Sequence, residues 1–193
     1  MRLPGRRRRR EREAEEDLAA VRVLADEDVT QLGEELTRLD GEVARLDRDG
    51  RVDYQNALDA YEAAQRSVPR MRRADDIAAV VDTLSTARYA MACVRSRLDR
   101  QPLPELKPPC YFNPQHGPST RDVRWTAPGR GTRMVPACAQ DAARVADGER
   151  PDVRTVRVGG RRIAYWEAGT ATDPYGHGYH VSGHVGRAAR LAR

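Results

Sequence analysis

The chain has 193 residues, of which 39% are hydrophobic and 33% are charged, and its aromatic residues are two Trp, seven Tyr and one Phe. This length suits one ordinary domain or two small ones and excludes a large multi-domain enzyme. Because large apolar side chains are scarce, helices that pack along narrow stripes are favoured over a broad two-sided sheet. No stretch approaches about 18 consecutive apolar residues, and no apolar region follows the N-terminal arginines, so we expect neither a membrane span nor a signal peptide.

The formal net charge of +5 is spread unevenly along the chain. Residues 1–12 contain seven Arg and one Glu, a net charge of +6, whereas residues 13–49 contain 13 acidic residues and four Arg, a net charge of −9. The remaining residues 50–193 contain 23 basic and 15 acidic residues and carry +8. We predict that residues 1–12 form a disordered basic arm. Its candidates for contact with a membrane or another polyanion are the adjacent Arg6, Arg7, Arg8, Arg9 and Arg10.

Three interpretations of this arginine run stay open. An anionic lipid surface would attract it, each arginine near the surface contributing roughly 1 kcal/mol. Nucleic acid would also attract it, through phosphate contacts that weaken as salt rises. Against nucleic acid, the acidic residues 13–49 follow directly, and no aromatic side chains for base stacking are interleaved with the arginines. In the third interpretation, the run is a solvated arm that pairs with those acidic residues.

Two stripes of apolar residues with heptad spacing predict a helical region over residues 13–100. The first stripe consists of Leu18, Val21, Ala25, Val29, Leu32, Leu36, Leu39, Val43 and Leu46. The second follows Asp75 and Asp76, which suit a helix N-terminus. It consists of Ile77, Val80, Leu84, Ala87, Met91, Val94 and Leu98. Because narrow stripes of this kind bury one another, we predict an antiparallel helical hairpin or a three-helix bundle.

A shorter helix is predicted between the stripes, from about Tyr54 to Val68. The polar, glycine-containing segment 47–51 separates it from the first stripe, and Pro69 ends it. Few positions outside the stripes are apolar, so a protruding coiled coil that recruits a protein partner is an alternative to a closed core.

A change of composition marks a second unit. Four prolines exclude a regular helix from residues 101–109, which we predict to be an extended linker. Beyond it we predict a small α+β module over residues 110–168, with a knuckle-like turn after Cys110, a hairpin over about 123–135, and a helix that starts at Cys138. In a treble-clef zinc module, a cysteine is followed by a hairpin and then by a second cysteine at the start of a helix. The predicted elements of this module occur in that order.

The candidate metal ligands of this module are Cys110, His116, Cys138 and Asp141. A complete treble-clef site has C-x-x-C at both ends, because four soft ligands close a tetrahedron around zinc. Here Asn113 and Asp141 occupy the second position of each pair, so the pattern is degenerate and the sequence by itself assigns no cofactor. Zinc binding, two buried thiols without metal, and a Cys110–Cys138 disulfide in an oxidising compartment all stay open.

A second hairpin is predicted where the alternating residues 153–158 and 161–166 flank Gly159-Gly160. We expect its apolar side chains to cover the cysteine module. Residues 169–193 are predicted to be a disordered tail rich in Gly and His, which we interpret as solvated rather than metal-binding. Its histidines are His177, His180 and His184.

Several segments of the chain resemble corresponding segments of one protein family. They are the arginine-rich start, parts of residues 26–36, residues 54–64, the run CYFNPQHGPS at 110–119 and the run VPACAQDAARV at 135–145. Through these segments, most of residues 6–168 resembles the cytoplasmic C-terminal region of a family of actinobacterial membrane-anchored proteins of unknown function. In that family a signal peptide and an extracytoplasmic domain precede one transmembrane helix, and the arginine run follows the helix.

The resemblance implies a cytoplasmic protein that lies at the inner face of the plasma membrane. Relative to the family pattern, we expect the exported domain and the transmembrane helix to be missing from this chain. The resemblance brings no catalytic residue with it.

Together these features predict a non-enzymatic interaction or scaffold protein that binds a protein partner at the cytoplasmic face of the membrane. No group of side chains has the acid, base and nucleophile spacing of a catalytic site, so we do not expect an enzyme. The alternative is a zinc-binding or nucleic-acid-binding module that uses the arginine run together with Cys110 and Cys138.

Overall fold

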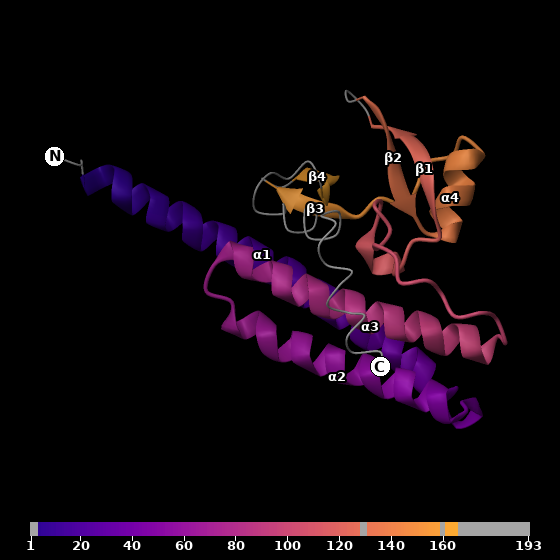
Figure 1. Cartoon of the computed structure of the whole chain (residues 1–193). Coiled ribbons are helices and arrows are strands. Elements are labelled where there is room, and N and C mark those ends of the chain that lie inside the picture. Colours follow the sequence, from indigo (N-terminus) through magenta and orange to yellow (C-terminus); the bar gives the residue numbers. More distant parts are fainter. Residues whose placement is uncertain (1–3, 128–130, 159–160, 166–193) are drawn as a thin grey trace.

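The computed structural model describes residues 4–127, 131–158 and 161–165. It consists mainly of helices, followed by a small α+β module, which confirms the predicted fold class (Figure 1). The described helices are α1 (Pro4–Asp40), α2 (Arg48–Ser67), α3 (Ile77–Leu98) and α4 (Ala139–Ala146). The described strands are β1 (Arg121–Thr126), β2 (Thr132–Ala137), β3 (Thr155–Val158) and β4 (Arg161–Ala164). Short 3-10 turns are η1 (Val43–Arg45), η2 (Val68–Arg70), η3 (Ala74–Asp76) and η4 (Pro114–His116).

Helices α1, α2 and α3 lie side by side as a three-helix bundle (Figure 1). Both predicted heptad stripes face its interior, because a repeat of about 3.5 residues keeps one side of each helix toward its neighbours. Leu32, Leu84 and Met91 are completely buried there. Burying each such side chain stabilises the fold by roughly 1.5–3 kcal/mol. The residues that the periodicity selected therefore form much of the bundle core, which also includes buried residues outside the stripes, such as Leu24 and Val81.

The connection between α1 and α2 lies slightly earlier than the predicted break at 47–51. Helix α1 ends at Asp40, and α2 already begins at Arg48, because Asp47 caps it by accepting the Gly50 N–H at 2.7 Å. Gly50 therefore lies inside the first turn of α2. A Cβ atom at this position would lie 2.9 Å from Leu46 Cδ2, so a larger residue would require the Leu46 side chain to shift.

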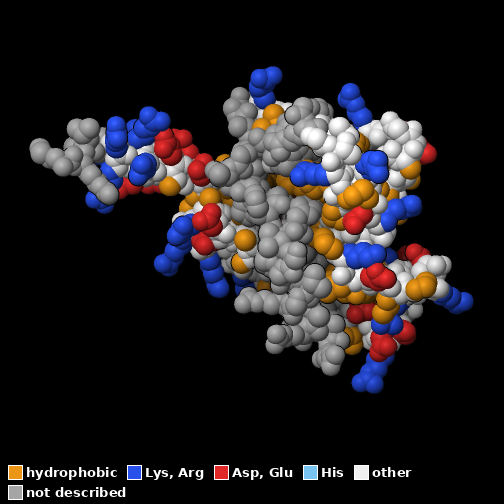
Figure 2. All heavy atoms as spheres, turned by 45° about the horizontal axis from the view of Figure 1, so that its top comes forward, with side chains coloured by type: hydrophobic (Ala, Val, Ile, Leu, Met, Phe, Trp, Pro, Cys, Tyr) orange, Lys and Arg blue, Asp and Glu red, His pale blue; other side chains and the backbone are white. Residues whose placement is uncertain are grey.

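The prediction of a disordered arm over residues 1–12 is wrong for residues 4–12, which continue α1 toward the N-terminus. Two ion pairs with the i,i+4 spacing of a helix, Arg7–Glu11 at 2.8 Å and Arg9–Glu13 at 2.7 Å, support this segment. Arginine is also a good helix former. The segment projects beyond the bundle, and its charged side chains surround the protruding end (Figures 1 and 2).

The described parts of the module contain two separate antiparallel hairpins. Strands β1 and β2 pair with Val123 opposite Val135, and both of these side chains pack with Phe112 in a small core of the module. Helix α4 contacts the same two strands. Residues 101–109 approach this unit as an extended segment without helix.

The second hairpin, β3–β4, packs differently from the prediction. Val156 and the completely buried Tyr165 belong to the bundle core, and Ile163 packs against it. The expectation that this hairpin covers the cysteine module therefore holds only for Val153, which packs against the core of the module. A two-stranded hairpin by itself is at best marginally stable in water, so its apolar side chains need another surface to pack on. The predicted Gly159-Gly160 turn lies outside the described residues.

The predicted tail over 169–193 also lies outside the described residues, as do His177, His180 and His184. Within the described part, residues 74–98 form one helix that is long and apolar enough to cross a membrane by length and composition alone. More than half of its most apolar window is buried inside the bundle, and a core helix passes the same test. This helix includes the second heptad stripe.

Candidate metal centre

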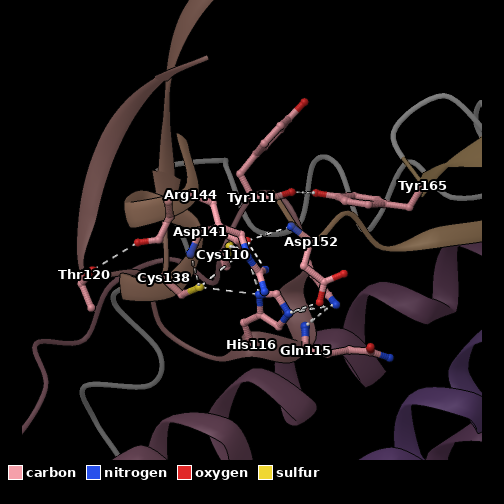
Figure 3. A network of polar contacts seen from close by, with 12 residues as sticks. Cys110, Tyr111, Gln115, His116, Thr120, Cys138, Asp141, Arg144, Asp152 and Tyr165 are labelled. Atoms are coloured by element: carbon pink, nitrogen blue, oxygen red, sulfur yellow. Dashed lines mark hydrogen bonds and ion pairs between the residues drawn. The ribbon is translucent and has the colours of Figure 1, made fainter. Parts of the chain in front are cut away.

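Four predicted ligand residues meet at one point of the module (Figure 3). One ligand atom from each of them lies within 4.8 Å of the other three. Cys110 follows the extended linker, His116 closes η4, Cys138 precedes α4, and Asp141 lies in its first turn. All four candidate metal ligands predicted from the sequence, Cys110, His116, Cys138 and Asp141, are therefore brought together.

A tight turn positions the first two ligands. The Cys110 N–H donates to the Gly117 carbonyl at 3.0 Å, and Pro109 and Pro118 form an isolated bridge that closes the loop. Gly117 has a φ of +81°, a backbone conformation that favours glycine. Asn113, at the position of the missing cysteine, caps η4 by accepting the Gln115 N–H. This position therefore serves the turn instead of binding metal.

The start of α4 positions the other two ligands. Cys138 is the N-cap residue, and its Sγ accepts the Asp141 N–H at 3.4 Å. The two residues lie one helical turn apart, so their side chains point toward the same side. Asp141 is completely buried, which is unusual for a carboxylate without a strong partner. The Cys-x-x-Asp spacing thus brings a sulfur and a carboxylate oxygen to one place.

Several distances between the ligand atoms are close to the edges of a zinc tetrahedron. Tetrahedral zinc, with Zn–S of about 2.3 Å and Zn–N or Zn–O of about 2.0–2.1 Å, separates its ligand atoms by about 3.3–3.8 Å. Asp141 Oδ2 lies 3.3 Å from Cys110 Sγ and 3.6 Å from Cys138 Sγ. His116 Nδ1 lies 3.6 Å from Cys138 Sγ and 2.9 Å from Asp141 Oδ2. Three of these four separations fall in the zinc range, and the fourth is shorter.

Further side chains hold the ligands from outside. His116 Nε2, the ring nitrogen that faces away from the sulfurs, lies 3.1 Å from Asp152 Oδ2. The second oxygen of Asp141, Oδ1, accepts the Asp152 N–H at 2.8 Å and a guanidinium N–H of Arg144 at 3.1 Å. Carboxylate–histidine contacts of this kind orient ligands in zinc sites. Sequence reasoning missed both outer residues: Arg144 follows Asp141 by one helical turn, but no local pattern pointed to Asp152.

The protonation of the four groups without metal follows from their contacts. Hydrogen bonding between the two thiols raises the pKa of Cys110, and burial raises it further. The same contact lowers the pKa of Cys138 to about 5. Burial alone would lower the pKa of His116, but hydrogen bonding and charge from Cys138 and the charge of Asp141 raise it to about 9. Burial opposes ionisation of Asp141, yet the Asp152 N–H and its other partners lower its pKa.

Two sulfurs, one imidazole nitrogen and one carboxylate oxygen are a donor set that zinc accepts in tetrahedral sites. The sulfurs are available, because Cys110 and Cys138 are free thiols, as is the remote Cys93. The predicted arginine run does not join this site, since it lies at the projecting end of α1 (Figure 1). The structure therefore separates the two features that the alternative prediction combined in one binding module.

Comparison with known proteins gave no match: no family model, no curated protein and no solved structure is significantly similar to this chain.

Proposed function

We propose that the protein is a non-enzymatic scaffold whose cysteine module is stabilised by one structural zinc ion. The observation that supports this proposal best is the convergence of Cys110, His116, Cys138 and Asp141 at separations close to the edges of a zinc tetrahedron. The scaffold presents the polar outer faces of its long helices to a protein partner.

A structural role fits this donor set better than a catalytic one. Four protein ligands fill a tetrahedron, whereas catalytic zinc keeps one position for water or substrate. Cys110 and Asp141 are buried, and the His116 side chain is only 19% exposed, so solvent has little access. Bound zinc would also replace the protons that now form hydrogen bonds among the two cysteines and the imidazole.

Elemental analysis of the purified full chain tests the proposal. We expect about one equivalent of zinc per chain, and after replacement by Co²⁺ an absorption spectrum typical of tetrahedral cobalt–thiolate coordination. Cys110→Ser and Cys138→Ser should lose the metal, whereas Cys93→Ser, which changes the third buried thiol, should keep it. Less than about a tenth of an equivalent in the wild type, even after incubation with zinc, would exclude the metal centre.

A second proposal concerns the arginine run and the cellular location. We propose that the projecting end of α1 contacts anionic lipid at the inner face of the plasma membrane, as the family resemblance implies. Arg6, Arg8, Arg10 and Arg12 are exposed and have no ion-pair partner in the described part of the chain. Arginines of this kind can bind lipid headgroups, each contributing roughly 1 kcal/mol at low salt.

Vesicle sedimentation tests this contact. The full chain should bind vesicles that contain phosphatidylserine, bind neutral phosphatidylcholine vesicles far less, and dissociate at high salt. Replacing these four arginines by Gln should abolish binding. A control with the same charge change replaces four exposed arginines elsewhere: Arg48, Arg51, Arg70 and Arg72. Binding to duplex DNA in preference to the anionic vesicles would contradict the lipid proposal and favour nucleic acid.

A further inference from the structure

We infer that Asp28 on α1 couples occupancy of the metal centre to docking of the cysteine module on the helical bundle. This inference rests on the proposed zinc site. The position of Asp28 is the first observation. Its carboxylate is 1% exposed and lies on the inner side of α1, where Ala25 and Leu32 are completely buried. A buried carboxylate is costly unless it is paired and hydrogen-bonded, so its partners matter to the fold.

Two partners of Asp28 come from the module, and both reach the same oxygen. Gln115 Nε2 donates a hydrogen bond to Asp28 Oδ1. Arg154 Nη2 lies 2.6 Å from the same Oδ1, and its side chain is only 8% exposed. The neighbouring Glu27 lies farther from Arg154 Nη2, at 3.8 Å, and is largely exposed. Asp28 is therefore the buried point on α1 at which two segments of the module meet.

Each of these segments also supports the metal centre. Gln115 directly precedes His116 in η4, and the two side chains point in different directions, His116 into the cluster and Gln115 away from it (Figure 3). Arg154 follows Asp152 by two residues in an extended stretch, and Asp152 contacts His116 and Asp141. One short segment thus links His116 to Asp28, and the other links Asp152 to Asp28.

The backbone around these segments is fixed by hydrogen bonds within the module. The Arg154 N–H donates to the Phe112 carbonyl at 2.9 Å, and the Tyr165 N–H donates to the Arg154 carbonyl at 3.0 Å. Gln115 is next to His116 in the chain, and Arg154 is two residues from Asp152. A displacement of His116 or Asp152 should therefore also displace Gln115 or Arg154.

The consequence is reciprocal coupling. If bound metal holds His116 and Asp152 in place, it also holds Gln115 and Arg154 in position for Asp28, and the module docks more firmly. By linkage, the factor by which bound metal strengthens docking equals the factor by which docking strengthens metal binding. Couplings of this kind are commonly about 5–150-fold. Loss of zinc would loosen the module from α1 without unfolding the bundle.

The test measures zinc affinity of the full chain by competition with a chromogenic chelator. Asp28→Asn should raise the dissociation constant for zinc at least about fivefold while still binding one equivalent. Gln115→Ala, a milder change that removes one donor, should raise it by a smaller factor and covers the case in which Asp28→Asn does not fold. The control Asp26→Asn removes an exposed carboxylate two residues away on α1 and should leave the affinity unchanged.

Hydrogen exchange gives a structural readout that a simple charge effect would not change. Zinc should slow exchange of the α1 amides around Asp28 in the wild type, and much less in Asp28→Asn. The inference is overturned if Asp28→Asn and Gln115→Ala are folded, bind one equivalent, and keep the wild-type zinc affinity within about twofold. If the wild type binds no zinc, the proposed metal centre itself fails, which is a different outcome.

Discussion

Asp152 Oδ2 lies 3.1 Å from His116 Nε2, on the side of the imidazole ring opposite the nitrogen that faces Cys138. The same residue donates its backbone N–H to Asp141 Oδ1 at 2.8 Å. One residue outside the ligand set thus orients two ligands. It fixes the imidazole by its charge and the carboxylate by its backbone.

We predict that Asp152→Asn weakens zinc binding by about 10–100-fold, the effect usually found when a carboxylate behind a histidine ligand is changed. The substitution keeps the backbone N–H and therefore the contact with Asp141, so it isolates the contribution of the side chain to His116. Chelator competition measures the effect. Asp147→Asn, which changes an exposed carboxylate after α4, is the matched control. Equal affinities for the two variants would contradict the orienting role of Asp152.

Removal of the metal should unfold the module before the bundle. Trp125 reports on this region, because its ring packs edge-on against Phe112 with ring centroids 5.2 Å apart. In a Trp166→Phe background, which leaves Trp125 as the single Trp, a strong chelator should shift its fluorescence emission toward longer wavelengths. The helical circular dichroism should remain largely unchanged, since α1, α2 and α3 share a separate core. The prediction fails if Trp125 emission stays the same, or if the helices are lost together with it.

Zinc binding should release about two protons near pH 7. Without metal, His116 is protonated because its pKa is raised to about 9, and the raised pKa of Cys110 keeps that thiol protonated. Cys138, with a pKa of about 5, and Asp141, with a lowered pKa, are already ionised. Protons therefore compete with zinc at His116 and Cys110, and zinc affinity should rise as pH increases toward about 9.

Calorimetry in buffers of different ionisation enthalpy counts these protons. His116→Gln should lower the count by about one if the variant still binds the metal through its other ligands. A pH-independent affinity across this range would show that the four groups do not titrate as the contacts indicate.

The inner stripe of α3 should dominate the stability of the bundle. Leu84 is completely buried, so Leu84→Ala should lower the free energy of unfolding by about 2–5 kcal/mol. Val23 on α1 is 59% exposed, and Val23→Ala should change the free energy of unfolding by no more than about 0.5 kcal/mol. Denaturant unfolding followed by circular dichroism compares the two variants. Similar losses for both would mean that the stripe is not the core.

The bundle and the cluster of four candidate ligands could be predicted from sequence because much of each depends on local spacing. A heptad repeat shows which side chains share a helix face, and Cys138 and Asp141 lie within one turn of the same helix. Cys110 and His116 are close along the chain, and a glycine turn brings them together. The helical state of the arginine run was missed, although its i,i+4 Arg–Glu pairs are a local signal for helix.

Only the tertiary structure decided how the pieces join. Asp152 reaches His116 across 36 residues, and Gln115 reaches Asp28 across 87, so no local pattern announces either contact. The β3–β4 hairpin has an alternation that predicts strands, but the alternation does not say which apolar surface its inner side chains will cover. Spacing along the chain determines helices, turns and the order of ligands. A buried charge such as Asp28 needs partners, because burial without them is costly. Which residues become those partners depends on which distant segments fold against it.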